Sequence, residues 1–309
     1  MPSLTFHTVD AFTTKPFSGN PAAVIVLTEP LEDNILLNIA IEFNLSETAF
    51  VLPLQDHTEE NPHLLIRWFT PAAEVPLCGH ATLASASVLF SPSSPLPISP
   101  SASLIRFETL HSGPLTAERR GEKIVLNFPA ASGILEPQSF ATSGEYYEIV
   151  KTAIEKAAPS LEGQVVAVTK TGFGPLVEIS SAVSIEGIKV DTTFIADGIP
   201  EFLVAITQPS PSPSPSFDVY SRVFAPKVGI SEDPVTGAAH TMIGPYWLST
   251  AARTRLGNSK FASPESAKGE VLVCSQVSAR GGEMDVTYQE GRVELIGSAR
   301  LMMKGVISF

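Results

Sequence analysis

The stretch EVPLCGHATLASASVLF, residues 74–90, places a thiol, a glycine and an imidazole side by side at Cys78, Gly79 and His80. A neutral imidazole can both donate and accept a hydrogen bond, and the start of a helix is a setting that lowers the pKa of a thiol. The small and apolar residues that follow predict a closely packed helix. The motif is therefore either a catalytic cluster or only the first turn of a buried helix.

The motif has a counterpart in the second half of the chain. Residues 67–84 read RWFTPAAEVPLCGHATLA, and residues 222–243 read RVFAPKVGISEDPVTGAAHTMI. Both contain Arg-x-Phe-x-Pro, then Glu-x-Pro-x-x-Gly, then small residues that open a helix. Aligning the glycines matches Cys78 with Thr236, Gly79 with Gly237 and His80 with Ala238. The copies lie about half the chain apart, which indicates a duplicated domain rather than a solenoid of repeats about 20–50 residues long.

Each copy predicts a helix that begins at a glycine, Gly79 or Gly237. The first N–H groups of a helix have no partner within it, and together with the helix dipole they attract anions. If the halves pack as pseudo-twofold mates, the two helix ends converge on a cleft that can bind a carboxylate without a basic side chain. The alternative is that both are buried helix starts, with small residues there for packing. Two copies with ionisable groups nearby favour a site.

Other elements must bring further groups to these helices. Residues 4–12 and 22–27 alternate or run apolar in the manner of strands. Residues 33–43 carry apolar side chains at helical spacing, and Asn44 is suited to a left-handed cap. Glu47 follows that helix and precedes a short run rich in strand-forming residues.

Composition narrows the class of protein. The length of 309 residues predicts two domains, and 44% hydrophobic with 17% charged residues is typical of globular chains. A net charge of -12 without a basic cluster argues against nucleic acid as a partner. No apolar run approaches the roughly 20 residues of a membrane span, and two cysteines fit a reducing, cytoplasmic setting. Pro/Ser-rich residues 91–103 and 209–216 predict exposed connections.

Several stretches resemble the signatures of the phenazine-biosynthesis PhzF-like family. They are GNPAAV (19–24), NLSETAF (44–50), the two copies described above, CSQVSARGGEMDV (274–286) and GRVELIGSA (291–299). They follow one another from near residue 9 to near the end, so the resemblance covers almost the whole chain. The variant CGHAT is closer to the animal and fungal phenazine biosynthesis-like domain proteins than to the bacterial pathway enzyme.

The resemblance implies an α+β fold of the diaminopimelate-epimerase-like superfamily. Two pseudo-symmetric halves would each wrap a curved, mostly antiparallel sheet around a central helix. We expect the halves to span residues 1–120, with the C-terminal strand 298–309 as a candidate addition, and residues 121–297. The family chemistry is proton transfer in the cleft between the halves, with no cofactor and no metal. The resemblance also suggests a homodimer.

Three residues correspond to acid/base groups of the family. Glu47 corresponds to the general acid/base, and burial would raise its pKa towards the value of about 6 to 7 that suits a base for carbon acids. The alternative for Glu47 is a solvated turn carboxylate or a cap. His80 corresponds to a substrate-contacting or proton-relaying histidine, and helix N–H groups should keep it neutral; the alternative is a satisfied buried histidine. Asp233 would orient the substrate or carry a proton, or simply cap a helix.

The remaining candidates bind substrate: Asn20, Cys78, Gly79, Gly237 and Ala238. Cys78 occupies the place of one catalytic thiol of the related amino-acid epimerases, but its mate Thr236 argues against a racemase with two thiols. We expect Cys78 to line the cleft, with a buried small hydrophobe as the alternative. Ala238 stands where the family usually has serine, and the loss of that hydroxyl would cost about 0.5–1.5 kcal/mol of carboxylate binding.

The sequence thus predicts a cofactor-independent isomerase that shifts a proton on a small carboxylated substrate, with Glu47 as the acid/base. Two alternatives stay open. The first is a catalytically weak or inactive scaffold that acts through protein contacts, for which Ala238 leaves room. The second is an amino-acid racemase or epimerase that depends on Cys78.

Overall fold

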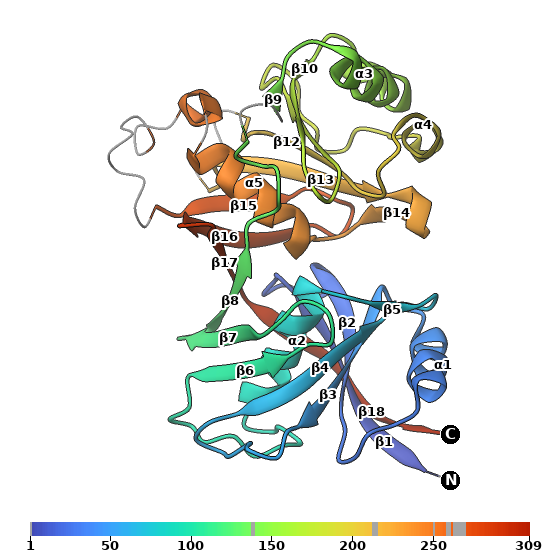
Figure 1. Cartoon of the computed structure of the whole chain (residues 1–309), viewed down its shortest axis with the longest axis vertical. Coiled ribbons are helices and arrows are strands. Elements are labelled where there is room, and N and C mark those ends of the chain that lie inside the picture. Colours follow the sequence, from blue (N-terminus) through green and yellow to red (C-terminus); the bar gives the residue numbers. More distant parts are fainter. Residues whose placement is uncertain (1, 137–139, 212–215, 250, 258–260, 262–269) are drawn as a thin grey trace. The chain divides into compact units, whose positions relative to one another are not determined.

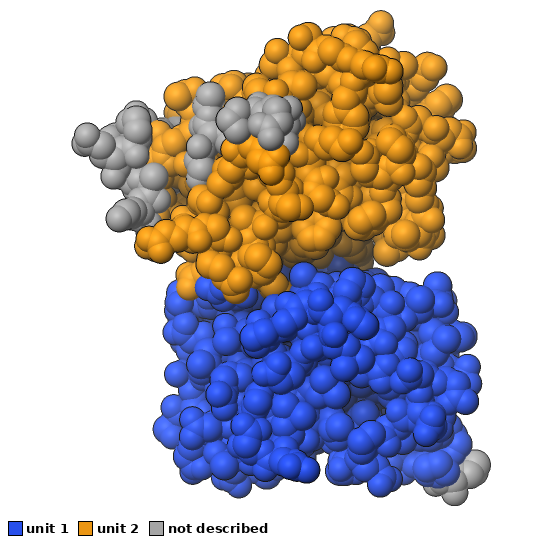
Figure 2. Space-filling view, in the orientation of Figure 1, with its two compact units in different colours: residues 1–127, 296–309 blue, residues 128–295 orange. Residues whose placement is uncertain are grey.

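The computed structural model describes residues 2–136, 140–211, 216–249, 251–257, 261 and 270–309. Figure 1 labels its helices and strands. The chain divides into two compact units, which Figure 2 shows in different colours: unit 1 is Met1–Asn127 with Ile296–Phe309, and unit 2 is Phe128–Leu295. Within the Pro/Ser-rich stretch 209–216, Pro209 still pairs with Val219 in the sheet, whereas residues 212–215 lie outside the described residues.

Unit 1 is built on a curved sheet. Its strands are β1 (Ser3–Ala11), β2 (Asn20–Val26), β3 (Glu47–Pro53), β4 (His63–Phe69), β5 (Glu74–Val75), β6 (Leu104–Glu108), β7 (Leu115–Arg120), β8 (Lys123–Pro129) and β18 (Ala299–Ser308). They pair in the order β18–β1–β2–β3–β4–β6–β7–β8, with β5 added to β4. Pairs β2–β3 and β4–β6 are parallel, because a helical crossover joins each: α1 (Asp33–Phe43) and α2 (Gly79–Phe90).

Unit 2 repeats this plan. Its strands are β9 (Phe140–Ala141), β10 (Val165–Lys170), β11 (Pro175–Ile179), β12 (Val204–Pro209), β13 (Val219–Ala225), β14 (Ile230–Asp233), β15 (Leu272–Gln276), β16 (Gly282–Gln289) and β17 (Arg292–Gly297). Its helices are α3 (Glu145–Ala157), α4 (Thr192–Gly198) and α5 (Gly237–Ser249), with short 3₁₀ turns at Pro159–Leu161, Pro226–Val228 and Ala251–Leu256.

The strand pairings of unit 2 match those of unit 1 one for one. In unit 2 the pairs are antiparallel β10–β11, parallel β11–β12, antiparallel β12–β13 and parallel β13–β15. This is the same series as β1–β2, β2–β3, β3–β4 and β4–β6 in unit 1. Strand β14 adds to β13 as β5 adds to β4. Helices α2 and α5 fall at corresponding places. The predicted α+β fold of two similar halves is thus confirmed.

Helix α2 lies inside the sheet of unit 1. It contacts β1, β2, β3, β7 and β18, and every residue of the helix except Ser87 and Phe90 is buried. Small side chains in its first turns let the strands approach closely enough to wrap around it. The prediction that the Cys-Gly-His motif begins a buried helix is confirmed. None of the helices among the described residues is long and apolar enough to span a membrane.

Candidate active site

Two chain reversals place candidate residues of unit 1 at one end of α2. Helix α1 ends as predicted at Asn44, whose left-handed φ of 50° turns the chain into β3, and Glu47 is the first residue of that strand. Gly19, at φ +74°, makes the corresponding turn before Asn20 and β2. The position requires glycine, because a Cβ there would lie 2.3 Å from the carbonyl oxygen of Ala11.

The adjacent strands β2 and β3 bring two of these side chains beside the start of α2. They run parallel, with Ala22 opposite Glu47, and both pack on α2. Cys78 is the N-cap residue of that helix, and its side chain makes no capping hydrogen bond. The structure therefore brings Glu47, His80, Asn20 and Cys78 together.

His80 is the centre of this cluster, which we call the His80 cluster. Its Nε2 atom lies 3.2 Å from Oε2 of Glu47. Its Nδ1 atom lies 3.3 Å from Nδ2 of Asn20 and 3.4 Å from Sγ of Cys78. Asn20 is fully buried, and the exposed fractions of the Glu47 and His80 side chains are 13% and 5%. Glu47 is thus largely enclosed, unlike a solvated turn carboxylate.

The contact between Glu47 and His80 leaves hydrogen-bonding capacity unused. Although Oε2 and Nε2 are 3.2 Å apart, their geometry does not make a hydrogen bond, and both atoms are buried without another partner. Buried polar atoms are nearly always satisfied in proteins. A polar atom of a bound molecule that lies beside both groups, within hydrogen-bond distance of each, would satisfy them, so this pair has the character of a site that is completed by its ligand.

The electrostatics of the cluster differ from two of our expectations. Burial opposes a charge on His80, but Cys78 and Glu47 outweigh it and raise the pKa of His80 well above its ordinary value. Burial, followed by the charge of Glu47, raises the pKa of the Cys78 thiol. Both pKa shifts are opposite in direction to those expected from the helix end, so that expectation is wrong, because contacts with Glu47 and desolvation dominate over the helix end.

The same side chains were tested as a metal site. Among the described residues, Glu47, Cys78 and His80 are the group whose potential donor atoms all lie within 4.8 Å of one another. Cys78, however, faces Nδ1 of the ring whereas Glu47 faces Nε2. An ion bound to Nδ1 of His80 would therefore have Cys78 beside it but not Glu47, and an ion bound to Nε2 would have Glu47 beside it but not Cys78. The arrangement suits proton transfer along the ring better than three-ligand coordination.

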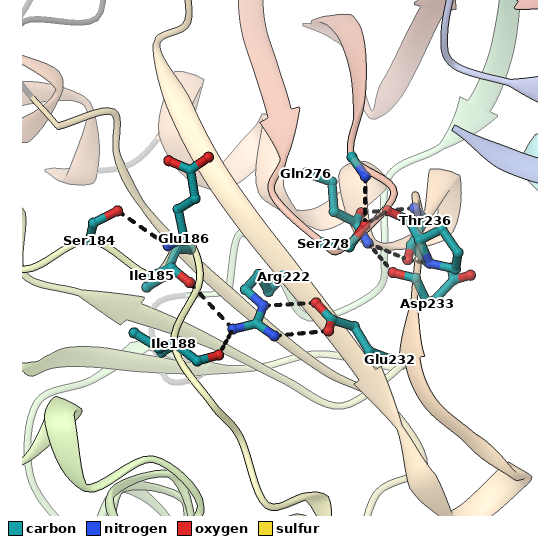
Figure 3. A network of polar contacts seen from close by, with 12 residues as sticks. Ser184, Ile185, Glu186, Ile188, Arg222, Glu232, Asp233, Thr236, Gln276 and Ser278 are labelled. Carbon is teal, nitrogen blue, oxygen red and sulfur yellow. Dashed lines mark hydrogen bonds and ion pairs between the residues drawn. The ribbon is translucent and has the colours of Figure 1, made fainter. Parts of the chain in front are cut away.

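Unit 2 holds its own polar group at the start of α5. Figure 3 shows Asp233, at the end of β14, beside Thr236 and Gln276. The hydroxyl of Thr236 donates to Asp233 Oδ2, and its backbone N–H donates to Gln276 Oε1 at 2.8 Å. Gln276 Nε2 in turn donates to the backbone oxygen of Asp233 at 2.6 Å. Asp233 is thus held in front of Gly237, and Ala238 follows as the second residue of α5.

The Arg and Glu of the repeated motif form the same clamp in both units. Arg67 donates to both carboxylate oxygens of Glu74 at 2.8 and 2.7 Å. Arg222 makes the equivalent pair of bonds to Glu232 at 2.7 and 2.8 Å, as Figure 3 shows. Each clamp ties the short strand that leads to the helix to its neighbour, which fixes where the helix begins.

Comparison with known proteins identifies the family. The model of the phenazine biosynthesis-like proteins, PhzC-PhzF, matches residues 9–305. The chain belongs to this family. Phenazine biosynthesis-like domain-containing protein 2 of Mus musculus is 38% identical over 310 residues, with 97% of each chain covered. A family protein of known structure, from Enterococcus faecalis, has a TM-score of 0.78 and 32% identity, with 100% of each chain covered.

A bacterial relative carries a functional name. An uncharacterized isomerase of Halalkalibacterium halodurans is 36% identical over 298 residues and covers 96% of each chain. Together with the family assignment, this relationship supports placing the chain among the isomerases.

Within this family member the two units differ chemically. Phe69 pairs with Thr48 and its repeat mate Phe224 pairs with Val204, so the position equivalent to Glu47 is Leu203. The equivalents of His80 and Cys78 are Ala238 and Thr236. The carboxylate–imidazole pair thus belongs to unit 1 alone. Convergence of the α2 and α5 ends on one cleft stays a prediction.

Two members of these polar groups had no assigned role in the sequence. Ser46 donates through its hydroxyl to Asn20 Oδ1 at 3.2 Å, and Gln276 joins the Asp233 group. Ser46 directly precedes Glu47, and Gln276 lies in the family-like stretch 274–286. Their positions in the sequence were the only indication that they could belong to the site, and a position does not show which atoms a side chain contacts.

Proposed function

We propose that this phenazine biosynthesis-like protein is an isomerase that moves a proton between two positions of a small carboxylated substrate, with Glu47 as the general acid/base. The observation that carries the proposal is the buried Glu47–His80 pair. Its facing oxygen and nitrogen lie 3.2 Å apart and have no hydrogen-bond partner among the described residues. The pair stands at the N-terminal end of α2, where an anion is favoured.

The proposed mechanism gives each group one task. The first N–H groups of α2, around Gly79, bind the substrate carboxylate, and the positive end of the helix dipole adds to this attraction. Glu47 removes a proton from a carbon atom near that carboxylate and returns it at a second position. The substrate gains and loses one proton, so no electron acceptor takes part. Acid/base catalysis of this kind typically contributes about 10²–10⁴-fold to a rate.

The racemase alternative is less well supported. A racemase that used Cys78 would need a thiolate, but burial and Glu47 raise the pKa of this thiol. It would also need a second base at the equivalent position, which Thr236 occupies. We therefore propose that Cys78 borders the reacting pair and takes no part as a nucleophile. The role of Asp233 in proton transfer stays a prediction, as does the binding of substrate by Gly237 and Ala238. The homodimer and the cytoplasmic location also stay predictions.

Proton exchange tests the proposal. The protein is incubated in deuterated water with a panel of small hydroxy, amino and unsaturated ring carboxylates, and loss of carbon-bound proton signals is followed by NMR. We expect exchange with at least one compound, and a rate at least about 100-fold lower in Glu47→Gln. Glu42→Gln, at an exposed site on α1, is the matched control and should exchange like the wild type.

Exchange that persists unchanged in Glu47→Gln contradicts the proposal. No exchange across the panel, with a stable protein complex isolated from a lysate, favours the scaffold.

A further inference from the structure

Ser46 and Asn20 form a hydrogen-bonded chain that ends on the side of His80 away from Glu47. The half-buried Ser46 hydroxyl donates to Oδ1 of Asn20 at 3.2 Å. Asn20 is fully buried at the start of β2, and its Nδ2 lies 3.3 Å from Nδ1 of His80. On the other edge of the ring, Nε2 faces Oε2 of Glu47 at 3.2 Å. In space, the four residues therefore form a line of contacts from the hydroxyl of Ser46 through Asn20 and His80 to the carboxylate of Glu47.

The direction of these contacts restricts where His80 can carry its proton. A side-chain amide has one oxygen that accepts and one NH₂ group that only donates. With the oxygen turned towards Ser46, the NH₂ group faces the ring, so Nδ1 must be the accepting nitrogen. The single proton of a neutral ring is then on Nε2, the atom beside Glu47.

Cys78 is compatible with this arrangement. Its sulfur lies 3.4 Å from the same Nδ1 atom. Because burial and Glu47 raise the pKa of the thiol, the S–H form can donate to an unprotonated Nδ1. When the ring carries two protons, the same sulfur is the weak acceptor available at Nδ1. Glu47 from β3 and Cys78 from the helix start are the titratable groups in contact with the ring.

We propose that Ser46 and Asn20 are positioning residues that hold neutral His80 in the tautomer protonated at Nε2, so that its proton lies on the edge of the ring beside Glu47 and is available to the reacting atoms. Asn20 on this account acts through His80 rather than on the substrate. The catalytic consequence rests on the proposed acid/base function of Glu47, whereas the tautomer itself does not. Ser46 then matters because its hydroxyl donates to Oδ1 of Asn20, which favours the orientation that turns the NH₂ group towards His80.

The tautomer is read directly from imidazole ¹⁵N shifts. Protein labelled with ¹⁵N-histidine is titrated, and the His80 signals are identified by their loss in His80→Gln. Above the pKa of the ring, we expect Nδ1 in the range of an unprotonated nitrogen and Nε2 in the range of a protonated one. An Nδ1–H form as the main species of the wild type would overturn the proposal.

Substitutions test the chain itself. Ser46→Ala removes the donor to the Asn20 oxygen and so weakens the preference for the observed amide orientation, and the fraction with a proton on Nδ1 should increase. Asn20→Asp places a carboxylate that can accept from Nδ1–H, and should shift the tautomer further. Ser46→Thr retains the hydroxyl and should resemble the wild type, as should Ser101→Ala at an exposed position. Unchanged tautomers in both Ser46→Ala and Asn20→Asp would refute the inference.

Activity then separates this inference from the proposed function. Once a substrate is known, Ser46→Ala should slow exchange by up to about 100-fold, a loss typical of a misplaced catalytic group. Ser46→Thr should recover most of the rate. If the tautomers behave as expected but Glu47→Gln retains exchange, the acid/base assignment alone fails. If Glu47→Gln loses exchange but the wild-type tautomer is Nδ1–H, the positioning inference alone fails.

Discussion

Glu232→Gln is expected to lower the free energy of unfolding by about 3 kcal/mol. Arg222 donates to the two oxygens of Glu232 at 2.7 and 2.8 Å, and only 9% of the arginine side chain is exposed. Glutamine keeps the shape of glutamate but leaves the enclosed guanidinium without a compensating charge. Breaking a buried pair in this way costs about 3–5 kcal/mol, and the 22% exposure of Glu232 places this case at the lower end.

The control is an exposed pair with the same separation. Arg120 and Glu118 also lie 2.7 Å apart, but 45% and 38% of their side chains are exposed, so Glu118→Gln should cost about 0.2–1 kcal/mol. Both variants are measured by urea unfolding followed by circular dichroism, with linear extrapolation to water. Replacing the first pair by Met at position 222 and Leu at position 232 should recover most of the loss. Equal losses for the two single variants, or less than about 1 kcal/mol for Glu232→Gln, would refute the reasoning.

Two further predictions concern the His80 cluster. Cys78 and Glu47 raise the pKa of His80 in the folded state against the effect of burial, so protonation of His80 stabilises the fold. This stabilisation is fully present below the pKa that His80 has in the unfolded chain, and it is lost as pH rises through the pKa of His80 in the folded protein. The stability difference between wild type and His80→Gln should therefore shrink as pH rises above about 6.5, and a growing difference in urea unfolding would contradict it. Cys78, with its raised pKa, and the fully buried Cys274 should both react with iodoacetamide much more slowly in the native protein than in urea, as peptide mass spectrometry can measure. Native Cys78 that reacts as fast as the unfolded thiol would rule out its enclosure.

Local features of the chain were the most predictable from sequence. The helix at 33–43 and its left-handed cap at Asn44 depend on spacing and on one residue type, and both match the structure. The duplication was also visible, because the Arg, Glu, Pro and Gly of the motif recur in order. The structure supplies the physical reason, which is that the arginine and glutamate of each copy form a bidentate pair before the helix.

Contacts between distant side chains could not be predicted in the same way. Gln276 meets Thr236 across 40 residues, and Ser46 meets Asn20 across 26, so no local pattern reports either bond. The pKa directions of His80 and Cys78 were wrong for the same reason. A helix end could be anticipated from the glycine, but the separation between Glu47 and the ring is set by the pairing of β2 with β3 and their packing on α2.

The central claim is that the carboxylate of Glu47 transfers the proton beside His80. The most direct measurement compares deuterium incorporation into an accepted substrate by the wild type, Glu47→Gln and Glu47→Asp, each shown to be folded by circular dichroism. The account predicts incorporation near background for glutamine and a reduced but measurable rate for aspartate, whose carboxylate is set back by one methylene. A glutamine variant that incorporates deuterium at the wild-type rate would contradict it.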